Sequence, residues 1–149
     1  IKNISIGIAS SAGKAWIHSA GKTTDLNKVW GDLPAQDDFL ESMAEAAKAI
    51  VDHCGDRILY ISVMNNLSVD CDCDSNPEPP RMGDIGILAS LDPVALDKAC
   101  VDLVYASEDE GKVHLIERME SRHGIHTLEH AEELGIGSQQ YELVDLDKK

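Results

Sequence analysis

The 149-residue chain has few basic side chains, few aromatic side chains and no long apolar run. Lysine and arginine together number 13 against 27 aspartates and glutamates, which gives a formal net charge of −14. Contacts with nucleic-acid phosphates and with anionic lipids both need cationic side chains, so this balance argues against either surface. No apolar run approaches the ~20 residues that a membrane-spanning helix requires. We therefore expect neither nucleic acid nor a membrane as a partner.

Cysteine is also scarce, and the four residues do not resemble the disulfide framework of a secreted protein. Cys54 and Cys100 fall on predicted helix faces, where a free cysteine behaves as a small apolar residue. Cys71 and Cys73 are separated by one residue, and cysteines so close seldom bridge each other. These features predict a reducing, cytoplasmic setting.

The chain opens at Ile1 without an initiator methionine and without a signal-peptide pattern. We interpret it as a piece of a longer polypeptide. On that interpretation, a missing N-terminal segment is one expected partner, because it could carry part of a site.

The spacing of apolar residues predicts alternating strands and helices in a chain long enough for one domain. Asp92 suits a helix N-cap and Pro93 suits the first helical position. The order fits a single α/β domain, a sandwich with a mixed or mostly parallel sheet flanked by helices. We expect strands at 4–9, 57–64, 84–89 and 141–144, and helices at 36–53, 93–106, 112–122 and 127–134.

Polar side chains follow the ends of several predicted strands. The run at 57–64 is rich in β-branched residues, which is typical of a strand buried on both faces. Its parallel pairing with 84–89 would use the loop between them as the crossover, and ligands bind beyond the carboxyl ends of such strands. That rule would gather Ser10, Ser11, Lys14, Asn65, Asn66, Ser90 and Asp92.

The segment from Gly7 to Ala15 invites comparison with a phosphate-binding loop. Five residues separate its glycines instead of four, and Ala15 stands where serine or threonine would contact magnesium. A looser anion cradle of backbone amides and a lysine is one interpretation, and a plain turn is the other. For the cradle we take Ser10, Ser11 and Gly13 as binding residues, with Lys14, Asp92 and Asp97 as candidate catalytic residues.

The acidic stretch Asp70-Cys71-Asp72-Cys73-Asp74 is the clearest candidate for metal chemistry. In an extended segment both thiols project to the same side and could reach one soft metal ion. Two thiols are too few for a closed zinc site or an iron–sulfur cluster, and without a metal the flanking carboxylates would raise the thiol pKa. The alternative is an acidic, solvated loop with incidental cysteines. Further ligands would have to come from His18, His114, His123, Asp84 or another chain.

Three histidines near the C-terminal end, at 123, 126 and 130, would share one face of a continuous helix. Gly124 should interrupt that helix, so the spacing favours surface histidines or histidines satisfied by neighbours over a metal site. No Ser-His-Asp or Cys-His pairing can be proposed from spacing.

One long string carries a family resemblance. Residues 82–103 (MGDIGILASLDPVALDKACVDL), preceded by Asp70-Cys71-Asp72-Cys73, resemble the domain-of-unknown-function family 362, also described as uncharacterised iron–sulfur centre proteins. The opening 2–19 and the closing 124–143 resemble the same family, so the likeness covers most of the chain and implies that an N-terminal part is missing. The motif positions are Lys14, His18, Cys71, Cys73, Asp84, Asp92 and Asp97.

The sequence departs from that family at one important place. Many members insert a ferredoxin-like segment with four-cysteine runs after the His-Ser position, whereas residues 20–40 here contain no cysteine. The resemblance therefore implies zinc or iron at most, with no complete iron–sulfur cluster motif, and it assigns no reaction.

Three functions follow from these patterns. The first is a metal-binding or redox-linked protein with Cys71 and Cys73 as soft ligands, completed by His18 or Asp84, and with a redox partner. The second is an enzyme that binds a small anion at strand ends through Lys14. The third is a non-catalytic interaction domain. Whether the chain is an enzyme stays open.

Overall fold

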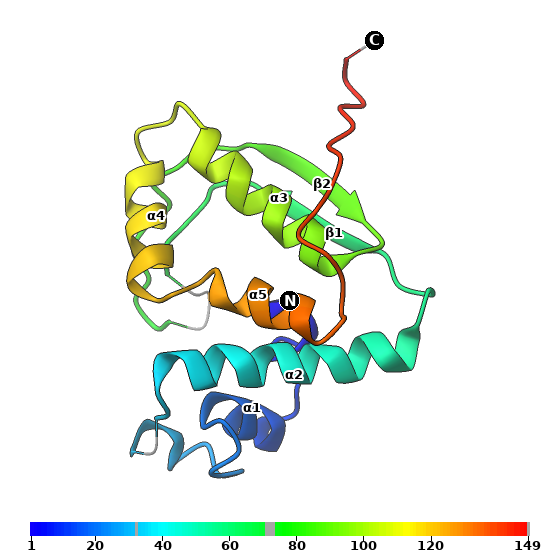
Figure 1. The fold of residues 1–149 in the computed structure, drawn as a ribbon. Coiled ribbons are helices and arrows are strands. Elements are labelled where there is room, and N and C mark those ends of the chain that lie inside the picture. The colour runs from blue at the N-terminus through cyan, green and yellow to red at the C-terminus, as the bar shows by residue number, and fades with distance from the viewer. Residues whose placement is uncertain (32, 71–73, 149) are drawn as a thin grey trace.

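The computed structural model describes residues 1–31, 33–70 and 74–148 and is rich in helices (Figure 1). The elements of the described chain, in order, are η1 (Lys2–Ile4), α1 (Ser11–His18), η2 (Val29–Gly31), α2 (Gln36–Cys54), β1 (Tyr60–Met64), β2 (Gly86–Ser90), α3 (Pro93–Ala106), α4 (Lys112–Ser121) and α5 (His126–Glu133). The elements η1 and η2 are short 3₁₀ turns that precede the long helix α2.

Helix α2 is the element on which the rest is arranged, and its position confirms the predicted helix at 36–53. Aspartates occupy its first turn, where they complement the positive end of the helix dipole. It ends at Gly55, whose φ of 57° is a conformation that glycine adopts without strain. Its buried residues recur at helical spacing; they are Leu40, Met43, Ala44 and Ala47.

Two apolar clusters lie on α2. Ile6 and Ile17 pack against Leu40 and Met43, which fixes α1 to one side of the helix. On the other side α3 and α5 pack over small alanines, and Figure 1 shows α1 and α5 separated by α2. Residues that belong to α1 are thereby kept away from the sheet. The second cluster comprises Ile1, Ala44, Ala47, Val94, Leu128, Ala131 and Ile136.

The predicted α/β sandwich with a mixed or mostly parallel sheet is wrong. Strands were correctly expected near 57–64 and 84–89, but β1 and β2 form a two-stranded antiparallel sheet, with Tyr60 opposite Ser90 and Met64 opposite Gly86. Helix α3 covers one face of this sheet.

The loop between the strands explains the error. It contains no helix among its described residues, so it does not carry the chain across the sheet. Instead it folds back on itself, because Leu67 and Met82 form an antiparallel bridge and the Ile85 amide donates to the Met64 carbonyl. The segment from β1 to β2 is therefore a long hairpin, and a hairpin makes its strands antiparallel.

The predicted strand at 4–9 is also wrong. Alternating isoleucines suggested it, but the Ser5 hydroxyl donates to the backbone oxygens of Ile1 and Lys2 and stabilises a tight turn instead. The Gly7 amide also donates to the Lys2 carbonyl, and Gly7 approaches the Asn3 backbone so closely that a β-carbon would overlap it. Within this turn, Ile6 packs into the apolar cluster that it forms with Ile17, Leu40 and Met43.

Toward the C-terminus the helices were predicted well and the last strand was not. Asp92 and Pro93 begin α3 as expected, and α4 and α5 lie within two residues of the predicted bounds. The described residues at 141–144 form no strand; this segment leaves the body of the fold after Tyr141 donates to Asp102 (Figure 1). Among the described residues, no helix has the length and apolar character needed to cross a membrane.

Candidate functional site

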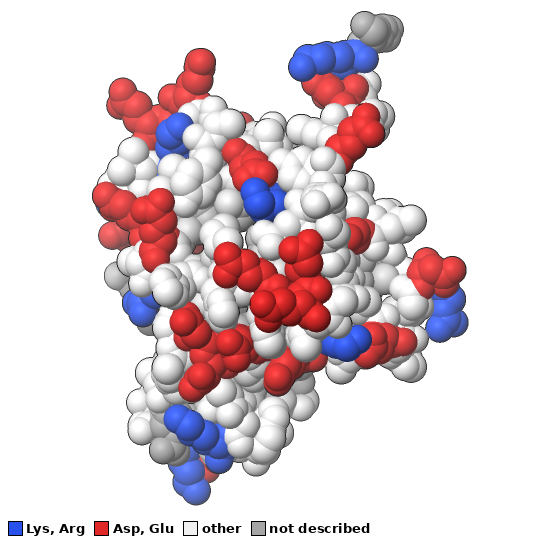
Figure 2. Space-filling model, viewed as in Figure 1, with Lys and Arg blue, Asp and Glu red and all other residues white. Residues whose placement is uncertain are grey.

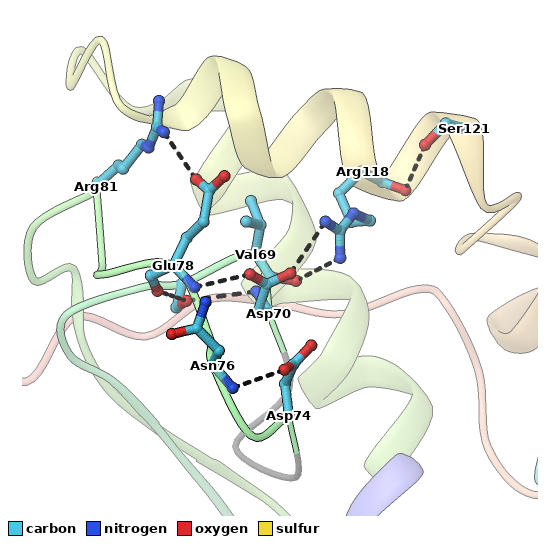
Figure 3. Close-up of polar contacts among 9 residues, drawn as sticks. Val69, Asp70, Asp74, Asn76, Glu78, Arg81, Arg118 and Ser121 are labelled. Carbon is cyan, nitrogen blue, oxygen red and sulfur yellow. Dashed lines mark hydrogen bonds and ion pairs between the residues drawn. The ribbon is translucent and has the colours of Figure 1, made fainter.

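A polar network joins the two limbs of the loop between β1 and β2, residues 68–70 and 78–81 (Figure 3). Asp70 connects three segments: its Oδ1 accepts from Arg118 Nη2 at 3.1 Å, and its Oδ2 accepts from the Glu78 amide at 2.9 Å. Arg118, on α4, also donates through Nη1 to the Val69 carbonyl at 3.0 Å. A planar guanidinium can make both contacts at once, so α4 fixes the start of the loop.

The returning limb of the loop is held in the same way. Ser68 donates to the Glu78 carbonyl at 3.3 Å, and the Glu78 carboxylate accepts from Arg81 Nη2 at 2.7 Å. Arg81 Nη1 lies 3.1 Å from His114 Nε2, a second contact with α4. The two limbs are therefore joined to each other (Figure 3), and each contacts α4, through Arg118 and through His114.

These contacts set the charge state of Asp70. The hydrogen bond from the Glu78 amide, followed by that from Arg118, lowers the pKa of the Asp70 carboxyl below its ordinary value. The carboxylate is thus ionised across the physiological range, and its role is to join the limbs.

The predicted metal ligands Cys71 and Cys73 lie outside the described residues, as does Asp72. The carboxylates beside this stretch are engaged: Asp74 accepts from the Asn76 amide at 2.9 Å, and Asp84 accepts from the Asn66 amide at 2.9 Å. Over the described ranges, no group of three or more histidine, cysteine, aspartate or glutamate side chains is arranged to hold a metal.

The predicted anion cradle is the first turn of α1 and does not follow a strand. Ser10 is the N-cap, and its Oγ accepts from the Gly13 amide at 3.2 Å. Ser11 is the first helical residue, and Lys14 lies half-buried in the next turn. The capping contact accounts for Ser10 without a bound anion. The predicted catalytic role of Lys14 stays a prediction.

His18, predicted as a metal ligand, ends α1. Its Nδ1 lies 2.7 Å from the Lys14 carbonyl, and its ring stacks on Phe39 with centroids 5.4 Å apart. Figure 1 places α1 on the opposite side of α2 from the loop that carries Asp84. The structure therefore does not bring His18 and Asp84 together.

Asp92 has a complete set of structural contacts. Its Oδ1 accepts from the Val94 and Ala95 amides at 2.8 and 3.0 Å, which caps α3. Its Oδ2 accepts from the Ser138 amide at 2.8 Å, and a β-carbon at Gly137 would overlap the carboxylate. One side chain thus joins the start of α3 to the turn after α5.

Asp97 lies one turn further along α3, and its Oδ2 accepts from the Ile1 amino group at 2.6 Å. Asp92 and Asp97 lie at the same end of α3. Lys14 belongs to α1, which packs on α2, so the structure does not bring it together with these aspartates. The acid–base roles proposed for these aspartates remain predictions.

Sequence reasoning missed a cleft of about 360 Å³ between α2 and the α4–α5 corner. Its lining includes Asp37, Tyr105, Glu120, His123, His126 and Glu129. His123 Nδ1 lies 3.0 Å from Asp37, so that histidine is satisfied by a neighbour, as the broken helix pattern suggested. The acidic partners come from about 85 residues away in the chain, and local spacing gives no signal of that approach.

His126 contacts two carboxylates at this cleft. Its Nε2 lies 2.9 Å from Glu41 Oε1 and its Nδ1 lies 3.5 Å from Glu129 Oε2. The hydrogen bond with Glu41 is the main reason that the pKa of His126 is raised. Figure 2 shows acidic side chains gathered over α2 and α5 on this face, so a protonated His126 joins two helices that carry many negative charges.

The remaining cysteines behave as the sequence predicted. Cys54 and Cys100 are free thiols on α2 and α3. Cys100 packs against the cluster between the sheet, α3 and α4, and burial raises the pKa of its thiol. This partly buried thiol is therefore less readily ionised than a free cysteine.

Comparison with known proteins gave one match. The family model described as "Domain of unknown function (DUF362)" matches residues 1–102, about two thirds of the chain. A search of curated proteins and a search of solved structures each found no match.

Proposed function

The chain belongs to the DUF362 family, and from that premise we propose that it binds a soft metal ion, zinc or iron, through the Cys71 and Cys73 thiolates. Both cysteines fall between β1 and β2, in the loop whose described limbs are joined to each other and to α4 by charged side chains. The family description assigns no function, so the proposal depends on this chain's own residues.

The observation that carries the proposal is the contact set of Asp70. Only three residues separate Asp70 from Asp74, and Asp70 is held by Arg118 and by the Glu78 amide. A short segment whose start is fixed loses less conformational entropy when two of its side chains bind one ion. Preorganisation of this kind supports a binding role over an incidental acidic loop.

The available donors define what sort of site this would be. Two thiolates favour soft ions, and both oxygens of Asp70 are already used by Arg118 and Glu78. Asp84 accepts from a backbone amide, and His18 belongs to the other side of α2. The set therefore fits a two-thiolate site with positions open to water or to a redox partner, and it does not fit a four-cysteine cluster. The thiols must be reduced, as they are in the cytoplasm.

The test compares metal content between matched variants. Full-length protein is stripped of metal, reloaded with zinc under reducing conditions and analysed for zinc per chain. We expect Cys71→Ser/Cys73→Ser to lose the bound zinc, and Cys54→Ser/Cys100→Ser to keep it, since those thiols lie on helices elsewhere. Cobalt(II) provides a second readout, because thiolate ligation produces a charge-transfer absorption band that the first variant should lack. Equal zinc content in both variants would refute the proposal.

A further inference from the structure

The outer face of the two-stranded sheet is entirely apolar and open to solvent. Side chains alternate along strands, and the register pairs Ile61 with Ala89 and Val63 with Ile87 on this face. Three large residues on this face and the two leucines that flank the strands, Leu59 and Leu91, are 59–72% exposed. We call these residues the sheet patch: Leu59, Ile61, Val63, Ile87, Ala89 and Leu91.

The opposite face of the same strands is less apolar although it is the covered one. It presents Tyr60, Ser62, Met64, Leu88 and Ser90 toward α3. An antiparallel sheet with one solvated face normally carries polar residues on that face. Strand β1 has an apolar residue at every position except Ser62, and such a strand is instead typical of one covered on both sides. Within the described residues α3 supplies only one cover.

The total surface is larger than that of a compact monomer, in part because the C-terminal segment extends away from the body of the fold (Figure 1). The chain exposes 9415 Å², whereas a compact monomer of 16.2 kDa would expose about 7,500 Å². The excess is roughly 1,900 Å², and a standard interface covers about 800 Å² on each partner. Besides the sheet patch, exposed large apolar residues include Ile8, Trp16 and Trp30 before α2, and Leu143, Val144 and Leu146 in the C-terminal segment.

We propose that the sheet patch is the interface of a homodimer, in which the sheets of two copies pack face to face about a two-fold axis. The patch has no charged or hydrogen-bonding side chain, so a partner with an ordinary mixed surface would bury its polar groups without compensation. A second copy presents an equally apolar surface, and a two-fold axis brings the same patch to both sides. Sheets packed in this way lie about 10 Å apart, which aliphatic side chains of this size fill.

Charge gives the dimer a distinctive salt dependence. Each copy carries a net charge of −14, and two such copies repel each other across the rim of an uncharged patch. Added salt screens that repulsion and should therefore tighten the dimer. A cationic partner on an acidic face would show the opposite dependence, with weaker binding at higher salt.

Sedimentation velocity over a range of protein concentrations tests the proposal. We expect the wild-type chain to form a dimer, and we expect its dissociation constant to be smaller at about 0.5 M salt than at about 0.05 M salt. Ile61→Thr/Ile87→Thr keeps β-branched residues but adds hydroxyls, and it should weaken the dimer about a hundredfold. Leu143→Ser/Val144→Ser changes equally exposed residues outside the patch and should leave the dimer unchanged.

A measurement on the wild-type chain guards against a variant that fails to fold. Hydrogen exchange of amides in 59–63 and 86–91 should slow as protein concentration rises. A chain that stays monomeric up to about 100 μM overturns the proposal. So does a dimer that survives the sheet substitutions in a folded variant, and so does a dimer lost through Leu143 and Val144, which would identify the C-terminal segment as the contact.

Discussion

Asp92 allows the sharpest test, because the same carboxylate was predicted as a catalytic group and is found holding two parts of the fold. Replacing it with alanine removes the N-cap of α3, which costs about 1 kcal/mol. It also leaves the half-buried Ser138 amide without its acceptor, which costs about 1 kcal/mol more. We therefore expect Asp92→Ala to lower the free energy of unfolding by about 2 kcal/mol, or the melting temperature by about 4–8 °C.

A second substitution separates the two contributions. Asp92→Ser keeps a side chain that caps helices well but is too short to reach the Ser138 amide, so it should recover about half of the loss. Asp56→Ala, at an exposed aspartate after α2, is the matched control and should change stability by less than about 0.5 kcal/mol.

The assay is urea unfolding followed by circular dichroism, read from the midpoint at constant slope. If Asp92→Ala unfolds within about 0.5 kcal/mol of wild type, the carboxylate is not the structural connection described above. If serine is as poor as alanine, the capping contribution has been overestimated and the Ser138 contact accounts for the loss.

Two further predictions concern charged contacts. His126 has a raised pKa in the fold, chiefly through Glu41, with Asp37 and Glu129 adding to it; its stabilising contribution is therefore complete below the unfolded pKa of about 6.5 and is lost as pH rises through the folded value. Urea midpoints measured from pH 5.5 to 8.5 (roughly spanning the titration range of histidine) should fall less steeply in His126→Gln than in wild type, and parallel curves would refute this. Arg118→Ala frees Asp70 and Val69, so limited proteolysis should cut the loop at 68–78 faster, while global stability changes little because exposed ion pairs contribute at most about 1 kcal/mol. Arg122→Ala on the adjoining turn is its control, and equal cleavage of both variants would contradict the assignment.

The candidate site shows where sequence reasoning reaches its limit. The loop with Cys71 and Cys73 was identified from residue types alone, but its connection to α4 through Arg118 spans 48 positions and leaves no local pattern. His126 and Glu41 meet across 85 positions in the same way. Conversely, the grouping of Ser10, Ser11 and Lys14 with strand ends depended on a strand at 4–9, and Ser5 forms a turn there instead.

The sequence by itself determined helices α2 to α5, whereas α1 was predicted as a loop. Apolar spacing, Asp92 with Pro93, and the stop at Gly55 specify α2 and α3 through interactions within a few residues, and such interactions can be read along the chain. The positions of β1 and β2 were also visible, since β-branched runs favour extended backbone, but the isoleucine-rich run at 4–9 forms a turn and 141–144 forms no strand. Only the tertiary structure decided how the strands pair, which side of α2 each segment occupies and which face of the sheet stays bare, because these depend on contacts between residues far apart in the chain.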